Sequence, residues 1–399
     1  MSTNSKTCAQ KKPSVYIKTF GCQMNVRDSE ALSGLLQDLG FRMQDSADGA
    51  DVILFNTCSV RQHAEDKVWS ELGRLKTIKG APPSFANAKL SRGDDYPQQK
   101  IIGVIGCMAQ NYKDEIFRRA PYVDLVVGPN DLLSLPVFIK QIIKERSQTL
   151  AVGTMEREQD FYVSDFRESK DHAYVVISEG CSNFCSYCIV PYVRGRLHSR
   201  DIQGILDEIK KTVDSGIKKI TLLGQNVNSY KFADINFVRL LEIINSIEGL
   251  EEFSFLTSHP KDTSEGLFCA MRDLEKCKKI LHLPIQSGSD RILELMNRGY
   301  SQGHYRNLAD KYRKIVNGKL STDIIVGFPT ETDEDFKETL DLLKDIEFDS
   351  AYIFKYSTRP HTKAEGLPDD VAKQEKERRH KILLDLQKEI SRRKRCKKE

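Results

Sequence analysis

The sequence has no long hydrophobic run. In its 399 residues no segment reaches the roughly 18 uninterrupted apolar residues of a membrane-spanning helix. The opening residues MSTNSKTCAQKKP lack the apolar core of a signal peptide. A nucleotide P-loop and a GxGxxG motif are also missing, which argues against ATP or dinucleotide binding. We therefore expect a cytoplasmic protein without a membrane partner.

A strong net charge is lacking as well. The formal net charge of +4 is too small to predict a polyanionic partner by itself. Residues 371–399, however, contain twelve Lys and Arg against five Asp and Glu, so this segment carries +7 and the rest of the chain −3. We expect a basic C-terminal helix over 371–399, which either binds phosphates or has a solvated face.

A repeated pattern fills the first region, residues 13–145. Apolar, β-rich runs end at Cys22, Cys58 and Cys107, and a helical pattern over 28–40 separates the first two. Strands that alternate with helices predict a doubly wound parallel sheet. Because the carboxyl ends of parallel strands meet at one edge, the three cysteines could meet there. The turn-rich stretch 81–100 is predicted as a surface loop.

After a polar passage over 146–170, predicted as a linker, residues 171–370 contain six strand candidates. They lie at 173–181, 218–227, 252–260, 280–288, 321–329 and 350–357. Six βα units are too few for a closed eight-unit barrel of about 250 residues, so we expect a partial (β/α)6 TIM-like barrel. Polar or Gly/Pro-rich residues follow these strands, at the face where such barrels carry their chemistry.

Ten cysteines in a cytosolic chain indicate ligands, catalytic groups or buried small side chains rather than disulfides. Cys181, Cys185 and Cys188 form a C-x3-C-x2-C run after the first barrel strand. Zinc would require a fourth ligand nearby, whereas a four-iron cluster can be held by three thiolates with one iron left open. A zinc site and a chance group of cysteines are the alternatives. Cys8, Cys269, Cys277 and Cys396 show no pattern.

A C-x3-C-x2-C run at the first strand of a partial barrel resembles the radical S-adenosylmethionine (SAM) enzymes. The resemblance extends over almost the whole chain through GCQMNVRDSE, NTCSVR, GCMAQ, CSNFCSYCIVPYVRGR, LLGQNVNSY, TSHP, HLPIQSGSDRILELMNRGY and DIIVGFPTET. In this order they resemble the tRNA methylthiotransferases of the MiaB type, which act on isopentenyladenosine beside the anticodon. A C-terminal TRAM domain usually follows in this family, and we expect this protein to lack it.

The resemblance implies two [4Fe–4S] clusters and SAM as cofactors. Cys22, Cys58 and Cys107 would hold an auxiliary cluster that carries the sulfur, and Cys181, Cys185 and Cys188 a radical cluster. Positions expected to contact SAM are Gly224, Gln225, Asn226, Gln286, Ser287 and Gly327, with ordinary turn chemistry as the alternative. We interpret His259 and His282 as strand-end histidines with internal partners.

The activity implied is methylthiolation of C2 of N6-isopentenyladenosine at position 37 of tRNA, with two SAM per turnover. The implied partners are the tRNA anticodon stem-loop, a low-potential electron donor and a sulfur donor system, with the enzyme as a monomer. Three alternatives remain open: methylthiolation of N6-threonylcarbamoyladenosine in tRNA, methylthiolation of a ribosomal-protein aspartate, and a non-catalytic iron–sulfur protein.

Overall fold

The chain folds as two compact units, Met1–Phe166 and Arg167–Glu399. The structure, a computed structural model, describes residues 13–60, 62–79, 100–145, 147–153 and 160–396. Apart from Lys100, the predicted surface loop over 81–100 lies outside the described residues. The two units are described in turn.

The N-terminal unit is built on a six-stranded sheet in which all strand pairs are parallel. In spatial order the strands are β2 (Arg42–Met43), β1 (Ser14–Thr19), β3 (Val52–Thr57), β4 (Ile101–Gly106), β5 (Leu125–Val127) and β6 (Thr149–Ala151). The central strands β3 and β4 are buried along their whole length, because apolar side chains point to both faces and helices cover them.

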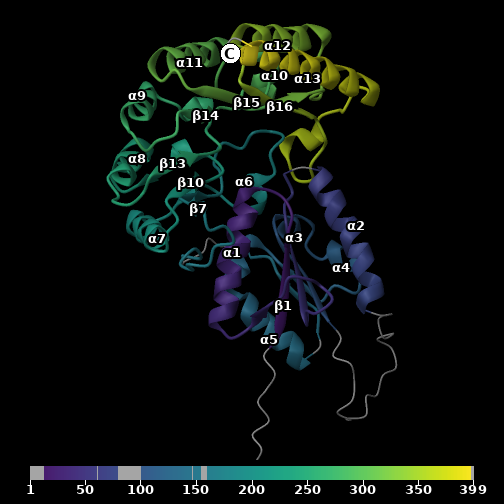
Figure 1. The fold of residues 1–399 in the computed structure, drawn as a ribbon. Helices are drawn as coiled ribbons and strands as arrows, with labels where there is room; N and C mark the ends of the chain where they lie inside the picture. Colours follow the sequence, from purple (N-terminus) through teal and green to yellow (C-terminus); the bar gives the residue numbers. More distant parts are fainter. Residues whose placement is uncertain (1–12, 61, 80–99, 146, 154–159, 397–399) are drawn as a thin grey trace, which may run out of the picture. The chain divides into compact units, whose positions relative to one another are not determined.

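Helices cover both faces of this sheet. They are α1 (Gln23–Asp38), α2 (Gln62–Lys79), α3 (Cys107–Tyr112), α4 (Glu115–Arg119) and α5 (Leu135–Glu145), with a 3-10 turn at Pro129–Ser134. Figure 1 shows α1 on one side of the strands and α2 on the other. The prediction of a doubly wound parallel sheet is confirmed. Because β2 lies on one side of β1 and β3 on the other, the order in which strands are added to the sheet reverses between β1 and β3, where such sheets bind ligands.

The passage over 146–170, which we predicted as a linker, contributes to the N-terminal unit. Its residues Thr149–Ala151 form the edge strand β6 beside β5. Further along, the Tyr162 hydroxyl donates to Asp28 Oδ1 at 2.7 Å, and Arg27 Nη2 donates to the Tyr162 carbonyl at 3.1 Å. These contacts hold the end of the passage on α1. The polar composition of the passage concealed its few buried aromatic anchors.

The second unit contains six parallel strands in chain order. They are β7 (Ala173–Val176), β10 (Lys219–Leu223), β13 (Glu252–Phe255), β14 (Ile280–His282), β15 (Lys319–Val326) and β16 (Ser350–Lys355). β7, β10 and β13 form one ladder and β14, β15 and β16 a second, and a parallel bridge between Phe253 and Cys277 lies between them. Among the described strands no pairing joins β7 to β16. The predicted partial barrel is confirmed.

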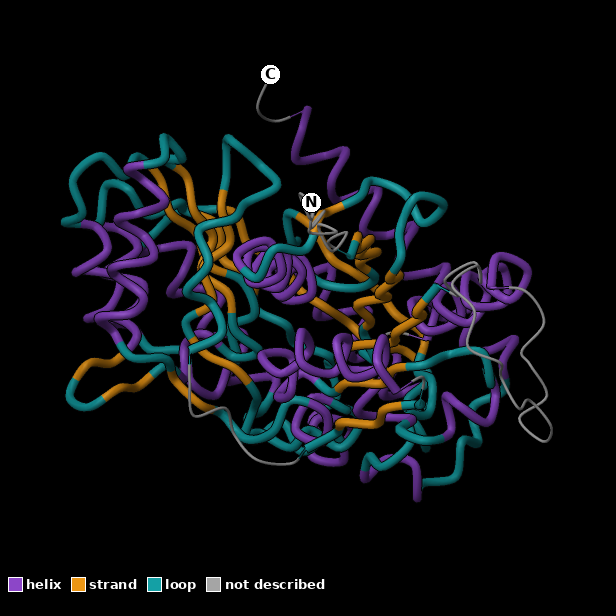
Figure 2. Tube along the Cα trace, turned by 90° about the horizontal axis from the view of Figure 1, so that it is seen from below, coloured by secondary structure: helices purple, strands orange, loops and turns teal. Residues whose placement is uncertain are grey.

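Helices follow most of these strands along the chain (Figure 2, helices purple and strands orange). They are α6 (Val190–Val193), α7 (Ile202–Asp214), α8 (Phe237–Asn245), α9 (Glu265–Asp273), α10 (Asp290–Leu295), α11 (Gln302–Ile315) and α12 (Asp333–Ile346). α7 shows the sequence features that form these helices. Asp201 caps its first turn by accepting from the Gln203 N–H, and Ile205 and Ile209 are fully buried on one face.

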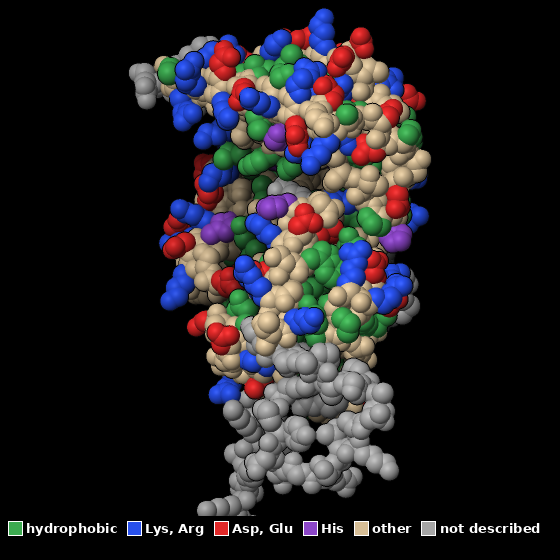
Figure 3. Space-filling model, turned by 90° about the vertical axis from the view of Figure 1, so that its right-hand side faces the viewer, with side chains coloured by type: hydrophobic (Ala, Val, Ile, Leu, Met, Phe, Trp, Pro, Cys, Tyr) green, Lys and Arg blue, Asp and Glu red, His purple; other side chains and the backbone are tan. Residues whose placement is uncertain are grey.

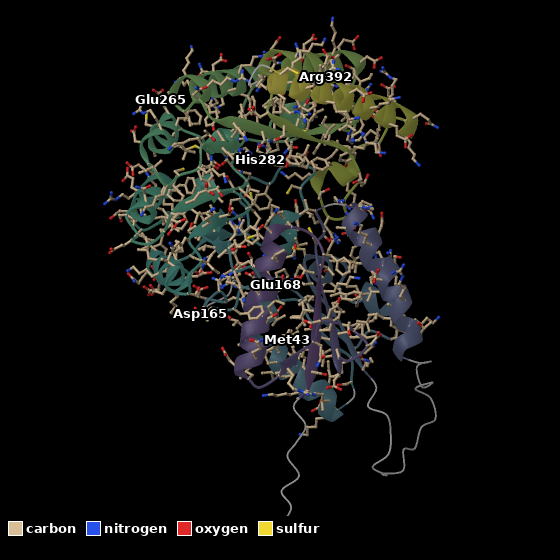
Figure 4. The ribbon with its side chains drawn as sticks, viewed as in Figure 1. Met43, Asp165, Glu168, Glu265, His282 and Arg392 are labelled. Atoms are coloured by element: carbon tan, nitrogen blue, oxygen red, sulfur yellow. The ribbon has the colours of Figure 1, made fainter. Side chains whose placement is uncertain are left out.

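The basic C-terminal segment forms one long helix, α13 (Lys373–Cys396). One face of it packs on the barrel: Leu383 and Ile390 are 0% exposed, and Gln387 Nε2 donates to the Phe348 carbonyl at 3.0 Å. Arg392 lies on the same helix (Figure 4). The segment is therefore a packed element of the barrel unit with a basic outer face.

The described surface mixes charges of both signs. Figure 3 shows Lys and Arg side chains interspersed with Asp and Glu over one face of the molecule. Within the described residues, no helix combines the length and the apolar character required to cross a membrane.

Candidate cluster sites

Three cysteines of the N-terminal unit follow three neighbouring strands. Cys22 follows β1 and caps α1, Cys58 follows β3, and Cys107 follows β4 as the first residue of α3. Because β1 pairs with β3 and β3 with β4, all three lie at the same edge of the sheet, and the first two flank its switch point. We call Cys22, Cys58 and Cys107 the N-terminal cysteine set.

The thiols of this set influence one another directly. Hydrogen bonding with the Cys22 thiol raises the pKa of the Cys58 thiol well above its ordinary value, and burial and the charges of Cys22 and Cys107 act in the same direction. Buried thiolates that lie close together repel one another, so a positively charged group among them would stabilise their ionised forms. The donor set is therefore suited to a cluster of iron ions, whose binding releases the thiol protons.

Two glycines permit this crowding. Gly21 has φ +121°, and a Cβ there would lie 2.2 Å from the Cys58 Cβ. Gly106 has φ +88°, and a Cβ there would lie 2.7 Å from both Asn56 Oδ1 and the Thr57 carbonyl oxygen. Only glycine adopts such conformations without strain and leaves room for so close an approach.

A buried pair of asparagines fixes the first turn of α1. Asn25 Oδ1 accepts from the Cys22 thiol at 3.3 Å, and Asn25 Nδ2 donates to Asn56 Oδ1 at 3.2 Å. Asn56 Nδ2 donates back to the Asn25 carbonyl at 2.9 Å. Both asparagines are 0% exposed, so this network ties the ends of β1 and β3 together.

The second unit carries Cys181, Cys185 and Cys188, which we call the barrel cysteine set, on the loop after β8 (Ser178–Glu179). The loop turns sharply: Phe184 has φ +46°, and Asn297 Nδ2 holds it by donating to the Phe184 carbonyl at 3.0 Å. Burial and the neighbouring Cys185 raise the pKa of the Cys188 thiol to about 12. The barrel cysteine set is therefore also suited to bind the positively charged iron–sulfur core of a cluster.

Within the described part of the chain, no group of three or more His, Cys, Asp and Glu residues could hold a single metal ion. A four-iron cluster makes a different demand, because each thiolate binds its own iron. Cysteine sulfur is the donor that such clusters take, and both cysteine sets supply three.

Six buried polar atoms around the barrel set have no hydrogen-bond partner among the described residues. They are Ser178 Oγ, Asn183 Nδ2, Gln225 Oε1, Asn226 Oδ1, Ser258 Oγ and His259 Nε2. They come from β8 (Ser178), from the cysteine loop and from the residues after β10 and β13. Buried polar groups are normally paired, so their concentration here fits a polar ligand with both donors and acceptors, such as SAM. Sequence reasoning missed Ser178 and Ser258.

The positions predicted to contact SAM divide into two groups. Gln225 and Asn226 contribute unpaired buried atoms, and a Cβ at Gly224 would lie 2.4 Å from Ser178 Oγ. Ser287, in contrast, has its hydroxyl beside Thr339 Oγ1 of α12, at 3.4 Å. Gln286 has φ +73°, and its N–H donates to the Asp323 carbonyl at 2.9 Å.

Gly327 is shaped by its contact with α13. It has φ +68°, and a Cβ there would lie 2.4 Å from Lys376 Cγ. Its N–H donates to Glu331 Oε1 at 3.0 Å, and Arg379 of α13 contacts the same carboxylate at 2.6 Å. The tight backbone at this position thus serves the packing of the terminal helix.

The two strand-end histidines differ. His282 lies on β14 in the interior of the unit, whereas Glu265 lies on the outer helix α9 (Figure 4). The Nδ1 atom of His282 lies 3.0 Å from Ser321 Oγ, and its Nε2 atom lies 3.4 Å from Asp323 Oδ2, as expected for an internally paired histidine. His259 accepts from the Lys261 N–H through Nδ1, but its Nε2 is one of the unpaired atoms, and burial lowers its pKa to about 2.

Two protein-family models match this chain, one in each of its two units. Residues 14–128 match the uncharacterized protein family UPF0004, and residues 175–343 match the radical SAM superfamily. A radical SAM methyltransferase, TsrM from Kitasatospora setae, is similar in structure with a TM-score of 0.62 and 12% sequence identity, over 88% of this chain and 74% of that one. The cobalamin-dependent radical enzyme OxsB is similar with a TM-score of 0.56 and 12% identity, over 96% and 56%. These likenesses concern the fold alone.

Relatives in sequence cover nearly the whole chain. A protein of Thermoanaerobacter sp. strain X514 is 44% identical over 94% of this chain and 78% of its own length. A protein of Clostridium novyi strain NT is 44% identical over 99% of this chain and 85% of its own. Both are named tRNA-2-methylthio-N(6)-dimethylallyladenosine synthase. The chain belongs to this family of radical SAM methylthiotransferases.

Proposed function

We propose that this protein is a tRNA methylthiotransferase, which joins a methylthio group to C2 of N6-dimethylallyladenosine at position 37. The observation that carries the proposal is the relationship to synthases of this name, at 44% identity over at least 94% of the chain. The C-x3-C-x2-C run inside the radical SAM match supports the radical chemistry. The substrate is the anticodon stem-loop of tRNA.

We assign one [4Fe–4S] cluster to each cysteine set. The barrel set would hold the radical cluster, which when bound supplies the electron that cleaves SAM into methionine and a 5′-deoxyadenosyl radical. The N-terminal set would hold the auxiliary cluster, the source of the transferred sulfur. In support, each set offers three thiols that lie close together, and this closeness favours the binding of positively charged groups.

The chain's own residues position SAM. Gln225 and Asn226 present carbonyl oxygens that can accept from its amino group, and His259 presents a neutral ring whose Nε2–H can donate to an oxygen. Because Nδ1 of His259 is already an acceptor, the proton must lie on Nε2. Burial of these atoms also excludes water, which protects a radical from side reactions.

Two further partners follow from the chemistry. A low-potential electron donor must reduce the radical cluster, and a sulfur donor must replace the sulfur that leaves. Since both cysteine sets belong to one chain, we propose a monomer. We also propose that it acts in the cytoplasm, with its tRNA substrate.

The test uses three anticodon stem-loops that differ only at position 37: adenosine, N6-dimethylallyladenosine and N6-threonylcarbamoyladenosine. Anaerobically reconstituted protein is incubated with each, SAM and a reductant, and the nucleosides are identified by mass spectrometry. We expect the 2-methylthio product only on the dimethylallyl substrate. A Cys185→Ala variant serves as the control and should form none. A product on the threonylcarbamoyl substrate instead would assign the sister activity.

A further inference from the structure

A buried arginine lies directly against the barrel cysteine set. Arg298 follows α10 and is 5% exposed. Its Nη1 donates to Cys185 Sγ at 3.3 Å, although the two residues are 113 positions apart. This contact joins the loop after α10 to the sulfur of a proposed cluster ligand.

The guanidinium is held rigidly in this orientation. Nη2 donates to the Pro284 carbonyl at 3.0 Å, and Nε donates to the Tyr300 hydroxyl at 2.9 Å. The Tyr300 hydroxyl is itself fixed, because it donates to the Ile285 carbonyl at 2.8 Å. With two of its nitrogens anchored, the planar guanidinium must direct Nη1 toward the sulfur.

None of the described carboxylates forms an ion pair with Arg298. Its other close polar neighbour is the Tyr187 hydroxyl, 3.4 Å from Nη1, which is neutral. A buried charge is costly unless an opposite charge compensates it. Thiolates of the barrel set, and the negatively charged cluster they would form with iron, are the available counter-charge. The arginine is therefore matched to an anionic group at Cys185.

We propose that Arg298 raises the reduction potential of the cluster held by Cys181, Cys185 and Cys188 through its buried positive charge and its N–H···S hydrogen bond to Cys185. The inference rests on the proposed function only for the presence of that cluster. Arg298 is a positioning residue, since it acts through the cysteine.

The physical reason is the charge that reduction adds. One electron from the external low-potential donor makes the cluster more negative by one charge, with no bond made or broken. A cation and a donated hydrogen bond stabilise that extra charge on the sulfur and its iron. Hydrogen bonds to cluster sulfurs and net charge are known determinants of such potentials. Without Arg298, the same donor would reduce the cluster to a smaller extent.

The experiment measures the midpoint potential by a redox titration followed by electron paramagnetic resonance. The full-length chain carries Cys22→Ala, Cys58→Ala and Cys107→Ala, so that only the barrel cluster contributes. Arg298→Gln and Arg298→Lys are compared in this background. Arg313→Gln is the matched control, because Arg313 of α11 also donates to backbone carbonyls but forms no hydrogen bond to a cysteine among the described residues. Iron and sulfide contents are determined for each.

We expect Arg298→Gln to shift the potential to a more negative value and Arg298→Lys, which keeps the charge, to shift it less. Arg313→Gln should leave it unchanged. An unchanged potential in Arg298→Gln with full iron content would overturn the proposal. If only Arg298→Lys binds iron, a negative shift supports the proposal and an unchanged potential overturns it. Variants that fold but bind no iron overturn it in favour of a role in cluster assembly.

These results are separable from the proposed function. A potential that depends on Arg298, together with no tRNA modification by the native sequence, supports the inference and contradicts the methylthiotransferase assignment. Normal tRNA modification together with a potential independent of Arg298 supports the methylthiotransferase assignment and contradicts the inference.

Discussion

At the scale of the single residue, the glycines before two cysteines decide whether the N-terminal set can form. Gly21 and Gly106 both have positive φ, and a Cβ at either would meet a neighbouring strand end below 3 Å. The nearest atom met at Gly21 is Cys58 Cβ, so the cysteine of the next strand would have to move. The geometry of the set therefore depends on these two positions.

Gly21→Ala should abolish iron binding by the N-terminal set and leave the barrel set intact. We expect iron per chain to fall from about eight to about four after anaerobic reconstitution, since each cluster contains four. Gly73→Ala on α2 is the control, because a Cβ there meets nothing within 4 Å and alanine is preferred in a helix. A Gly21→Ala protein that retains about eight irons would contradict this account of the site.

The six cysteines of the two candidate sites stand out in the sequence, because each repeats a position relative to a strand or to its neighbours. The residues that surround them were less accessible. Arg298 and Ser258 become functional candidates only through contacts, or missing contacts, with residues distant in sequence. His259 was interpreted as internally paired. Only the coordinates reveal that one of its nitrogens is paired and the other is not.

At the scale of the element, α13 shows how a charged composition conceals a packed face. Its Leu383, Gln387 and Ile390 recur at helical spacing and are buried, while the charged residues cover the remaining faces. Arg379 is also buried, where it pairs with Glu331 at 2.6 Å. The charge of the segment alone indicated a phosphate-binding or solvated helix.

Leu383→Ala should destabilise the barrel unit. Removal of a fully buried leucine leaves a cavity and typically costs about 2–5 kcal/mol of unfolding free energy. Chemical denaturation followed by circular dichroism measures the change. Lys388→Ala on the same helix, whose side chain is 75% exposed, should change the free energy by less than about 0.5 kcal/mol. Equal effects of the two substitutions would mean that α13 does not pack as described.

Strands with strong apolar runs were predictable, and short edge strands were not. Five of the six barrel strands lie within the predicted segments, and β15 begins two residues before its segment, at Lys319. These strands were recognisable because each run of β-branched and aromatic residues ends in a polar or Gly/Pro-rich turn. β2 and β6 contain two and three residues, too few for a periodic signal. α1 also begins earlier than the leucine pattern indicated, since Cys22 and Asn25 together form its capping box.

At the scale of the whole molecule, the chain divides its chemistry between two units with separate hydrophobic cores. Each unit presents one three-cysteine set at the carboxyl ends of parallel strands, the edge at which both fold types bind ligands. We therefore propose that the barrel unit forms the radical and that the N-terminal unit supplies the transferred sulfur. These two roles should be separable by substitution.

The most direct measurement quantifies 5′-deoxyadenosine and the 2-methylthio nucleoside in one mass-spectrometry experiment. Full-length protein with all three N-terminal cysteines changed to alanine is compared with the native sequence on the dimethylallyl stem-loop. We predict that this variant still cleaves SAM to 5′-deoxyadenosine but forms no methylthio nucleoside. A variant that still forms the methylthio nucleoside, or that no longer cleaves SAM while retaining its barrel iron, would contradict the division of roles.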